Sequence, residues 1–194
     1  MFMTQTQINP KPQAKWWSWR ENLRLIAIAL VLAVLLRTFI AEPRYIPSDS
    51  MLPTLATGDR LVVEKVSYHL HPPHRGDIVV FTPPPELHRA GSAFIKRVIA
   101  LPGQVVAIEN GQVYLDGQPL REDYLAEAID YTIPPVQVPP GQVFVLGDNR
   151  NHSNDSHVWG FLPQENIIGR AVWRFFPLDH FGPIVRSQTV QPGP

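Results

Sequence analysis

The chain has 194 residues, of which 44% are hydrophobic and 18% are charged, and its 17 basic residues balance its 17 acidic ones. This composition is too apolar for a disordered chain, and it lacks the basic excess that is typical of nucleic-acid-binding proteins. The absence of cysteine excludes disulfide bonds, thiolate nucleophiles and cysteine-based zinc sites. The 21 prolines, roughly twice the usual share of about 5%, favour short strands joined by turns over long helices.

The N-terminal region predicts a membrane anchor. The run from Leu25 to Leu36 is entirely apolar, and residues 22–42 together are long enough to cross a hydrocarbon core as one helix. Arg24 and Arg37 lie near the two ends, where long cationic side chains reach the membrane interface. Three tryptophans upstream, of the kind that line membrane interfaces, fit the same interpretation: Trp16, Trp17 and Trp19.

A cleavable signal peptide is the alternative for this region, but the flanking residues disfavour it. Arg37 directly follows the apolar run, and Phe39 stands two positions before Ala41, so no small-x-small cleavage site is present. Four basic residues precede the run against one acidic residue, Glu21; they are Lys11, Lys15, Arg20 and Arg24. The positive-inside rule therefore predicts a cytoplasmic tail over 1–21, an anchor over 22–42 and an extracytoplasmic domain over 43–194.

The extracytoplasmic part predicts a mostly β, antiparallel fold. Short β-branched or aromatic segments alternate with turn signals at 60–67, 77–81, 93–101, 104–109, 112–116, 142–146 and 168–176. Asn110-Gly111 predicts a tight type I′ hairpin turn, and the proline pairs at 72–73, 134–135 and 139–140 indicate loops. Residues 122–129 are consistent with one or two helical turns.

A lysine on an apolar strand is the first candidate for chemistry. Lys96 shares its strand face with Phe94 and Val98, so burial should remove water from its amine and lower its pKa towards that of a useful base. The neighbouring Arg97 lies on the opposite face and does not give up its proton in proteins. A lysine that merely extends from a half-buried strand to solvent is the alternative.

Two polar segments supply further candidates. In the first, Ile46 to Leu55, Ser48 and Ser50 flank one residue in a stretch stiffened by Pro47 and Pro53. A serine needs a base to become a nucleophile, and a second hydroxyl beside it can stabilise a developing oxyanion. The second segment, 147–157, is a loop rich in Asp, Asn, Ser and His, which suits groups that hold catalytic side chains in place. Either segment could instead be an ordinary solvated loop.

Taken together and in this order, these segments resemble the motifs of bacterial type I signal peptidases, in particular the cyanobacterial and thylakoid branch. The resemblance covers the serine segment, Lys96-Arg97-Val98 with Leu101-Pro102-Gly103 after it, and the Gly147–Ser156 loop. Arg75-Gly76-Asp77-Ile78-Val79 matches a further family segment. It implies a single transmembrane helix before a mainly antiparallel β-sheet peptidase domain that rests on the bilayer, in the periplasm or the thylakoid lumen. The implied activity is the removal of signal peptides from exported proteins by cleavage after small residues. The resemblance implies no cofactor and no metal.

The resemblance also implies roles for individual residues. Ser50 would be the nucleophile, Lys96 its general base, and the Ser50 N–H with the Ser48 hydroxyl the oxyanion hole. Ser153 would orient the Lys96 amine, and Asp155 would be a structural residue paired with an arginine. Two positions depart from the family pattern, because Asp49 replaces a usual glycine and His157 a usual arginine. We therefore expect Arg97 or Arg150 to pair with Asp155.

Other interpretations remain open on the sequence. A Ser-His-Asp hydrolase could use His152 or His157 with Asp148 or Asp155, since triads are defined by geometry and not by order. A metal site could use His69, His71 and His74, although the His-Pro-Pro-His loop in which they lie contains no acidic residue. A non-enzymatic membrane-anchored β-domain is the third alternative.

Met51, Leu52 and Leu55 are apolar and adjoin Ser50, so we also expect the mouth of the site to touch lipid.

Overall fold

The computed structural model describes residues 19–84 and 93–186. The chain separates into two compact units, Met1–Leu36 and Arg37–Pro194. Four residues of the predicted anchor region, Lys11, Lys15, Trp16 and Trp17, lie outside the described residues.

The described part of the N-terminal unit is an apolar helix. Helix α1 (Trp19–Leu35) continues into a π-helical turn at Leu36–Ile40. The stretch Trp19–Ile40 has 22 residues, a mean hydropathy of 2.4 and no buried side chain, so its length and composition suit a membrane span. The helical conformation ends at Ile40, and the last two residues of the predicted segment 22–42 begin a strand instead.

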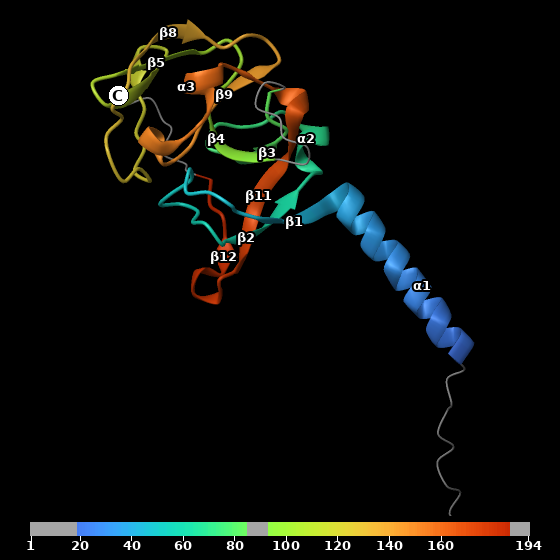
Figure 1. Ribbon diagram of the computed structural model, residues 1–194. Coiled ribbons are helices and arrows are strands. Elements are labelled where there is room, and N and C mark those ends of the chain that lie inside the picture. The colour runs from blue at the N-terminus through green and yellow to red at the C-terminus, as the bar shows by residue number, and fades with distance from the viewer. Residues whose placement is uncertain (1–18, 85–92, 187–194) are drawn as a thin grey trace, which may run out of the picture. The chain divides into compact units, whose positions relative to one another are not determined.

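The larger sheet carries most of the domain (Figure 1). Every recorded strand pair in it is antiparallel, and the strand order is β1-β2-β11-β3-β4-β9-β10, with β12 added to β11. Its strands are β1 (Ala41–Tyr45), β2 (Arg60–Glu64), β3 (Ile78–Phe81), β4 (Phe94–Ala100), β9 (Gln142–Leu146), β10 (Leu162–Pro163), β11 (Ile167–Phe176) and β12 (Gly182–Pro183).

A second sheet lies at the end of the domain away from β1, β2 and β12 (Figure 1). Its order is β7-β6-β5-β8, again antiparallel, with β5 (Val105–Glu109), β6 (Gln112–Leu115), β7 (Gln118–Pro119) and β8 (Ile133–Gln137). Two short helices, α2 (Ser67–Leu70) and α3 (Ser156–Trp159), and 3-10 turns at Arg150–His152, Gln164–Asn166 and Leu178–His180 complete the domain. The predicted mostly β, antiparallel class is confirmed.

The predicted hairpin turn is present between β5 and β6. Asn110 and Gly111 have φ values of 51° and 76°, which is the pair of positive angles that a type I′ turn needs. Glu109 and Gln112 pair directly across it. The local chemistry of these two residues therefore decides where the chain reverses.

Two expectations about the region after β6 were wrong. Pro134 and Pro135 do not form a loop but lie inside strand β8, which pairs only with β5 and is the edge of its sheet. A proline is tolerated there because an edge strand leaves one row of backbone groups unpaired. Residues 122–129 form turns and bends but no helix.

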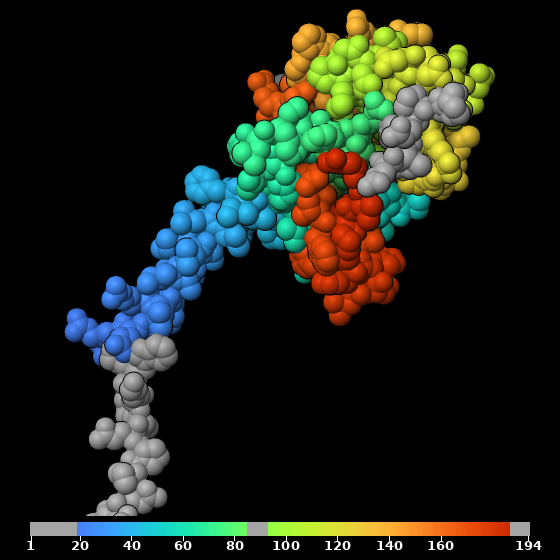
Figure 2. Space-filling model, turned by 180° about the vertical axis from the view of Figure 1, so that it is seen from behind, coloured from blue at the N-terminus to red at the C-terminus, as the bar shows by residue number. Residues whose placement is uncertain are grey.

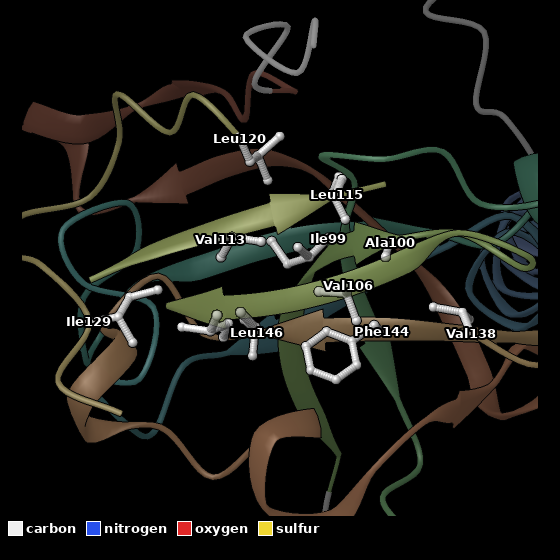
Figure 3. Packing of buried hydrophobic residues seen from close by; sticks show 11 residues of the cluster. Ile99, Ala100, Val106, Val113, Leu115, Leu120, Ile129, Val138, Phe144 and Leu146 are labelled. Atoms are coloured by element: carbon white, nitrogen blue, oxygen red, sulfur yellow. The ribbon is translucent and has the colours of Figure 1, made fainter. Parts of the chain in front are cut away.

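The two sheets pack through one hydrophobic core (Figure 3). Ile99 and Phe144 from the large sheet meet Val106, Ile108 and Val113 from the small one. A second cluster lies around β2, β3 and the serine segment, and a third contains Val79, Val98 and Val145. Strand β4 has clusters on both faces, so six of its seven residues are buried, and Lys96 and Arg97 are among them.

The β11–β12 hairpin projects from the rest of the domain (Figure 2) and exposes large apolar side chains. Trp173 and Phe181 contact each other edge to face, with ring centroids 5.4 Å apart. Phe176 and Leu178 are 47% and 78% exposed. Large apolar side chains gathered at one surface indicate contact with another apolar phase or partner.

Candidate active site

Ser50 lies in a tight turn between β1 and β2, and its own neighbours fix that turn. Ile46, Met51 and Leu55 are buried together in one hydrophobic cluster. The Ser50 carbonyl accepts a hydrogen bond of 3.1 Å from the backbone N–H of Asn149. The serine, 8% exposed, is thereby held between the core and the 147–157 loop.

This packing corrects the expectation that Met51 and Leu55 touch lipid. Their exposed fractions are 0% and 1%, so both are core residues that anchor the serine turn. Leu52 is only half-buried. Met51 and Leu55 are therefore apolar because they pack the serine turn onto the core, and not because they contact the membrane.

Lys96 reaches Ser50 from strand β4. Its Nζ lies 2.7 Å from Ser50 Oγ and donates a 2.9 Å hydrogen bond to the Ile95 carbonyl. The Phe94 ring centroid is 5.9 Å from the same nitrogen. Lys96 is 4% exposed, so its amine and the serine hydroxyl meet with little water between them.

Burial lowers the pKa of Lys96 to about 8, because an ammonium loses its hydration in this position. The negative charges of Asp155 and Asp148 act in the opposite direction and raise it. The sequence-based prediction of a lowered pKa is thus confirmed in its direction and in its cause. At neutral pH this lysine has a neutral fraction many times that of a solvated one.

The oxyanion-hole candidates lie beside the nucleophile. Ser48 Oγ is 3.3 Å from Ser50 Oγ. In the part of the chain that the structure describes, the Ser50 N–H donates to no protein acceptor. Both groups are therefore positioned as potential donors near the serine hydroxyl.

Arg97 binds the 147–157 loop and the serine segment together. Its Nε and Nη2 donate to the two oxygens of Asp148 over 2.8 and 2.5 Å, and both residues are buried. Thr54 Oγ1 donates to the same carboxylate over 2.5 Å. Thr54 belongs to the quoted serine segment, but its role was not predicted, because nothing local indicates a partner 94 positions away.

Arg150 is paired with a residue that sequence analysis missed altogether. Its Nη1 donates to Glu122 over 2.8 Å, and its Nε donates to the Gly147 carbonyl over 3.0 Å. Tyr124 donates to the same Glu122 carboxylate over 2.5 Å, and its ring stacks on the Arg97 guanidinium at 4.1 Å. These contacts join segments 28 positions apart, and no motif marks them.

Asp155 has neither of the expected arginine partners. It is fully buried, and its Oδ1 lies 2.8 Å from Nδ1 of His157. Its Oδ2 accepts the Gly147 N–H over 2.8 Å, and Oδ1 also accepts the His157 N–H at the start of α3. The expectation of Arg97 or Arg150 was wrong because Arg97 binds Asp148 and Arg150 binds Glu122. His157 is the partner of Asp155 instead.

Gly147 and Ser153 pack against the nucleophile. A Cβ on Gly147 would lie 2.2 Å from Ser153 Oγ and 2.4 Å from the Ser50 carbonyl oxygen, so only glycine fits. The Ser153 hydroxyl is buried and has no hydrogen-bond partner among the described residues. A bond from Ser153 to Lys96 is therefore not recorded, and its orienting role stays a prediction.

Asp49 causes no strain where the family has glycine. Its φ is not positive, so this turn does not need the left-handed region. Its carboxylate accepts the Thr57 hydroxyl over 2.7 Å, and its carbonyl accepts the Asn149 amide over 3.0 Å. The side chain thus adds a contact within the turn.

The histidines are arranged differently from a hydrolytic triad. Within the described ranges, Ser50 Oγ has Lys96 and Ser48 as its recorded partners and no histidine. His152 lines the same cleft, while His157 is bound to Asp155. His71 and His74 contact each other edge-on at 4.8 Å, and no group of three metal-binding side chains occurs among the described residues.

A cleft of about 590 Å³ opens onto the dyad. One wall is the stretch from Arg44 to Ser50, and the other is the stretch from Ala93 to Lys96. His152 and Asn154 from the loop also line it. The arrangement combines a hydroxyl, a desolvated amine and two potential oxyanion donors at a cleft, which suits acyl transfer.

Comparisons with known proteins identify the family to which this chain belongs. The profile of the family described as signal peptidase, peptidase S26, matches residues 19–176. A probable signal peptidase I-1 from Synechocystis is 65% identical over 91% of this chain and 91% of its own length. A signal peptidase I from Leptolyngbya laminosa is 54% identical over 84% and 82%. A probable thylakoidal processing peptidase 2 from Arabidopsis thaliana is 45% identical over 88% of this chain and 47% of its own length.

Proposed function

Because the chain belongs to the signal peptidase family, peptidase S26, we propose that it is a membrane-anchored serine endopeptidase that removes N-terminal signal peptides from exported proteins. The observation that carries the proposed mechanism is the 2.7 Å approach of a buried lysine amine to a serine hydroxyl. This activity requires neither a metal nor a cofactor.

In the proposed first step, the neutral Lys96 amine takes the proton of Ser50 as Oγ attacks the scissile carbonyl carbon. The new C–O bond moves the carbonyl electron pair onto oxygen, where the Ser50 N–H and the Ser48 hydroxyl stabilise the charge. The Lys96 ammonium then gives its proton to the leaving amine, the C–N bond breaks, and an acyl-serine remains. Water, deprotonated by the same lysine, hydrolyses this ester and restores Ser50.

The cleft favours an extended peptide with small side chains near the cut. Its walls carry the apolar side chains of Ile46, Val80 and Ile95 close to the dyad. Apolar walls of this kind suit the small residues that the family resemblance implies before the cleavage point.

The proposed topology places the tail in the cytoplasm and the catalytic domain in the periplasm or thylakoid lumen. Four basic residues against one acidic residue precede the apolar run Leu25–Leu36, and this charge bias sets orientation. The test uses sealed vesicles of the cytoplasmic membrane in right-side-out orientation. Protease added outside them should degrade the catalytic domain and leave a short, protected N-terminal fragment. Protection of the whole domain would reverse the orientation.

We place the contact with lipid at the β11–β12 hairpin. Trp173, Phe176, Leu178 and Phe181 are all more than one-third exposed there, and the interface region of a bilayer favours aromatic side chains. The lipid contact that we expected at Met51, Leu52 and Leu55 is thus assigned to this hairpin instead.

The mechanism is tested by assaying cleavage of a preprotein by the full-length enzyme in detergent. Ser50→Ala and Lys96→Arg should both lose at least about 1,000-fold in kcat/KM, because the first lacks the nucleophile and the second keeps the charge but cannot act as a base. Lys65→Ala should keep most activity, since Lys65 is paired with Glu42 and not with the dyad. The Lys65–Glu42 distance is 2.7 Å.

The alternatives give different results in the same assay. A Ser-His-Asp hydrolase would tolerate Lys96→Arg and would fail when His152 or His157 is replaced. A non-enzymatic β-domain would show no cleavage that depends on Ser50.

A further inference from the structure

His157 lies outside the dyad but is connected to it by an unbroken series of contacts. Its Nδ1–H donates to Asp155 over 2.8 Å, since an ionised carboxylate only accepts. The second oxygen of Asp155 accepts the Gly147 N–H over 2.8 Å. Gly147 in turn packs directly on the carbonyl of Ser50.

We propose that His157 is a positioning residue whose charge controls how readily Lys96 loses its proton. The proposal rests on the proposed function, in which Lys96 must be neutral to act as a base. It adds a titratable group to the dyad that neither the family motifs nor the mechanism above requires.

The coupling passes through the buried charge of Asp155. This carboxylate is fully buried, and its negative charge acts on Lys96 to raise the lysine pKa, against the larger effect of burial. When His157 is neutral, the carboxylate has hydrogen-bond donors but no cation beside it. When His157 is protonated, the pair is electrically neutral, so Asp155 holds a proton on Lys96 less strongly.

The sign of the effect follows directly. As the pH falls, Lys96 tends to gain the proton that inactivates it, and a histidine ring such as that of His157 can also gain one. The second event lowers the pKa of Lys96 and opposes the first. His157 therefore extends the active range of the enzyme towards acid.

Among the described residues, Asp155 is the carboxylate bound to the His157 ring. The ring stacks on Tyr131 with centroids 4.2 Å apart and planes 16° apart, and burial raises the pKa of that phenol, which stays neutral. The other charges that act on Tyr131 are Asp130 and the Arg150–Glu122 ion pair, whose charges oppose each other. The His157 side chain is 21% exposed, so it can exchange protons with solvent.

The test compares the acid limb of kcat/KM against pH in matched variants of the full-length enzyme. His157→Arg, a permanent cation, and Asp155→Asn, which deletes the negative charge, should both move the midpoint to lower pH by about half a unit or more. His157→Gln keeps a neutral donor that cannot gain a charge, so its midpoint should lie above that of His157→Arg. Tyr131→Phe keeps the stacked ring and should match the wild type.

A direct measurement separates this proposal from the proposed function. The Cε resonance of Lys96, followed by NMR through a pH titration, should shift its midpoint in His157→Arg by the same amount as the kinetic limb. That shift would support the coupling even if Lys96→Arg proved active, which would refute only the catalytic role of Lys96.

The proposal also predicts behaviour in the unmodified enzyme, so it does not depend on any variant folding. The Lys96 resonance of the wild type should show a second, smaller inflection at the pH where the His157 ring titrates. A single inflection, with equal kinetic midpoints in all variants and activity that follows only the melting temperature, would make the Asp155–His157 pair purely structural and overturn the proposal.

Discussion

Lys96→Met should abolish activity and at the same time stabilise the folded protein. A methionine has nearly the length of lysine and needs no hydration in a site that is 4% exposed. The lysine pKa falls from 10.5 to about 8 on folding. The unfolded chain therefore binds more protons than the folded one between these values, and the stability of the wild type rises with pH across this window.

The size of the effect follows from that pKa difference. At pH 7 the shift corresponds to about 3 kcal/mol of unfavourable free energy in the wild type. Loss of the Nζ bond to the Ile95 carbonyl offsets about 1 kcal/mol of the gain, so the net stabilisation is about 2 kcal/mol. By pH 10 the advantage should have fallen by about 2 kcal/mol, because the wild-type lysine is then neutral in the folded state.

Urea unfolding of the full-length protein in detergent, followed by tryptophan fluorescence, measures this difference at several pH values. Ser50→Ala is the matched control, because it is inactive but keeps Lys96 and should retain the wild-type pH dependence. Parallel stability curves for Lys96→Met and the wild type between pH 7 and pH 10 would show that Lys96 titrates normally and would refute the reasoning.

Three further outcomes are expected. Gly147→Ala should lower kcat/KM about 10-fold or more in the preprotein assay, because its Cβ would lie 2.4 Å from the Ser50 carbonyl, whereas Gly182→Ala, with open space around it, should be silent. Asp148→Ala should cost about 3 to 5 kcal/mol in urea unfolding, because Arg97 stays buried without its partner; a loss below about 1 kcal/mol would contradict the buried pair. Removal of residues 1–36, which form a separate unit, should preserve cleavage of a soluble peptide, and the rate of this cleavage should still change when lipid is added. A rate that is independent of lipid would contradict the lipid contact proposed for the β11–β12 hairpin.

The strands and the hairpin turn could be predicted because their signals are local. Alternating burial in β5 and β6 follows the period of two in their sequence, and Asn110-Gly111 specifies its own turn. Both faces of strand β4 are apolar in sequence, and Lys96 was chosen over Arg97 as the candidate base because arginine does not give up its proton. The Ser50–Lys96 pairing itself came from the order of the motifs, since 46 residues separate the two.

The partners of the buried charges could not be predicted in the same way. Whether Asp155 binds Arg97, Arg150 or His157 depends on which carboxylates the other guanidiniums reach in the folded domain. Glu122 carries no local signal, and its ion pair exists only because the turns before β8 fold beside the 147–157 loop. Strand β8 was missed because prolines usually argue against a strand, and its edge position is a property of the whole sheet.

The central claim is that Ser50, activated by Lys96, forms an acyl-enzyme with the substrate. The measurement that tests it most directly is peptide mapping by mass spectrometry after the full-length enzyme reacts with a serine-acylating inhibitor. We predict a single acyl group on Ser50, absent from Ser50→Ala and nearly absent from Lys96→Arg, while His152→Ala and His157→Gln retain it. Acylation of another residue, or labelling that survives Lys96→Arg and disappears with either histidine, would contradict the Ser-Lys mechanism.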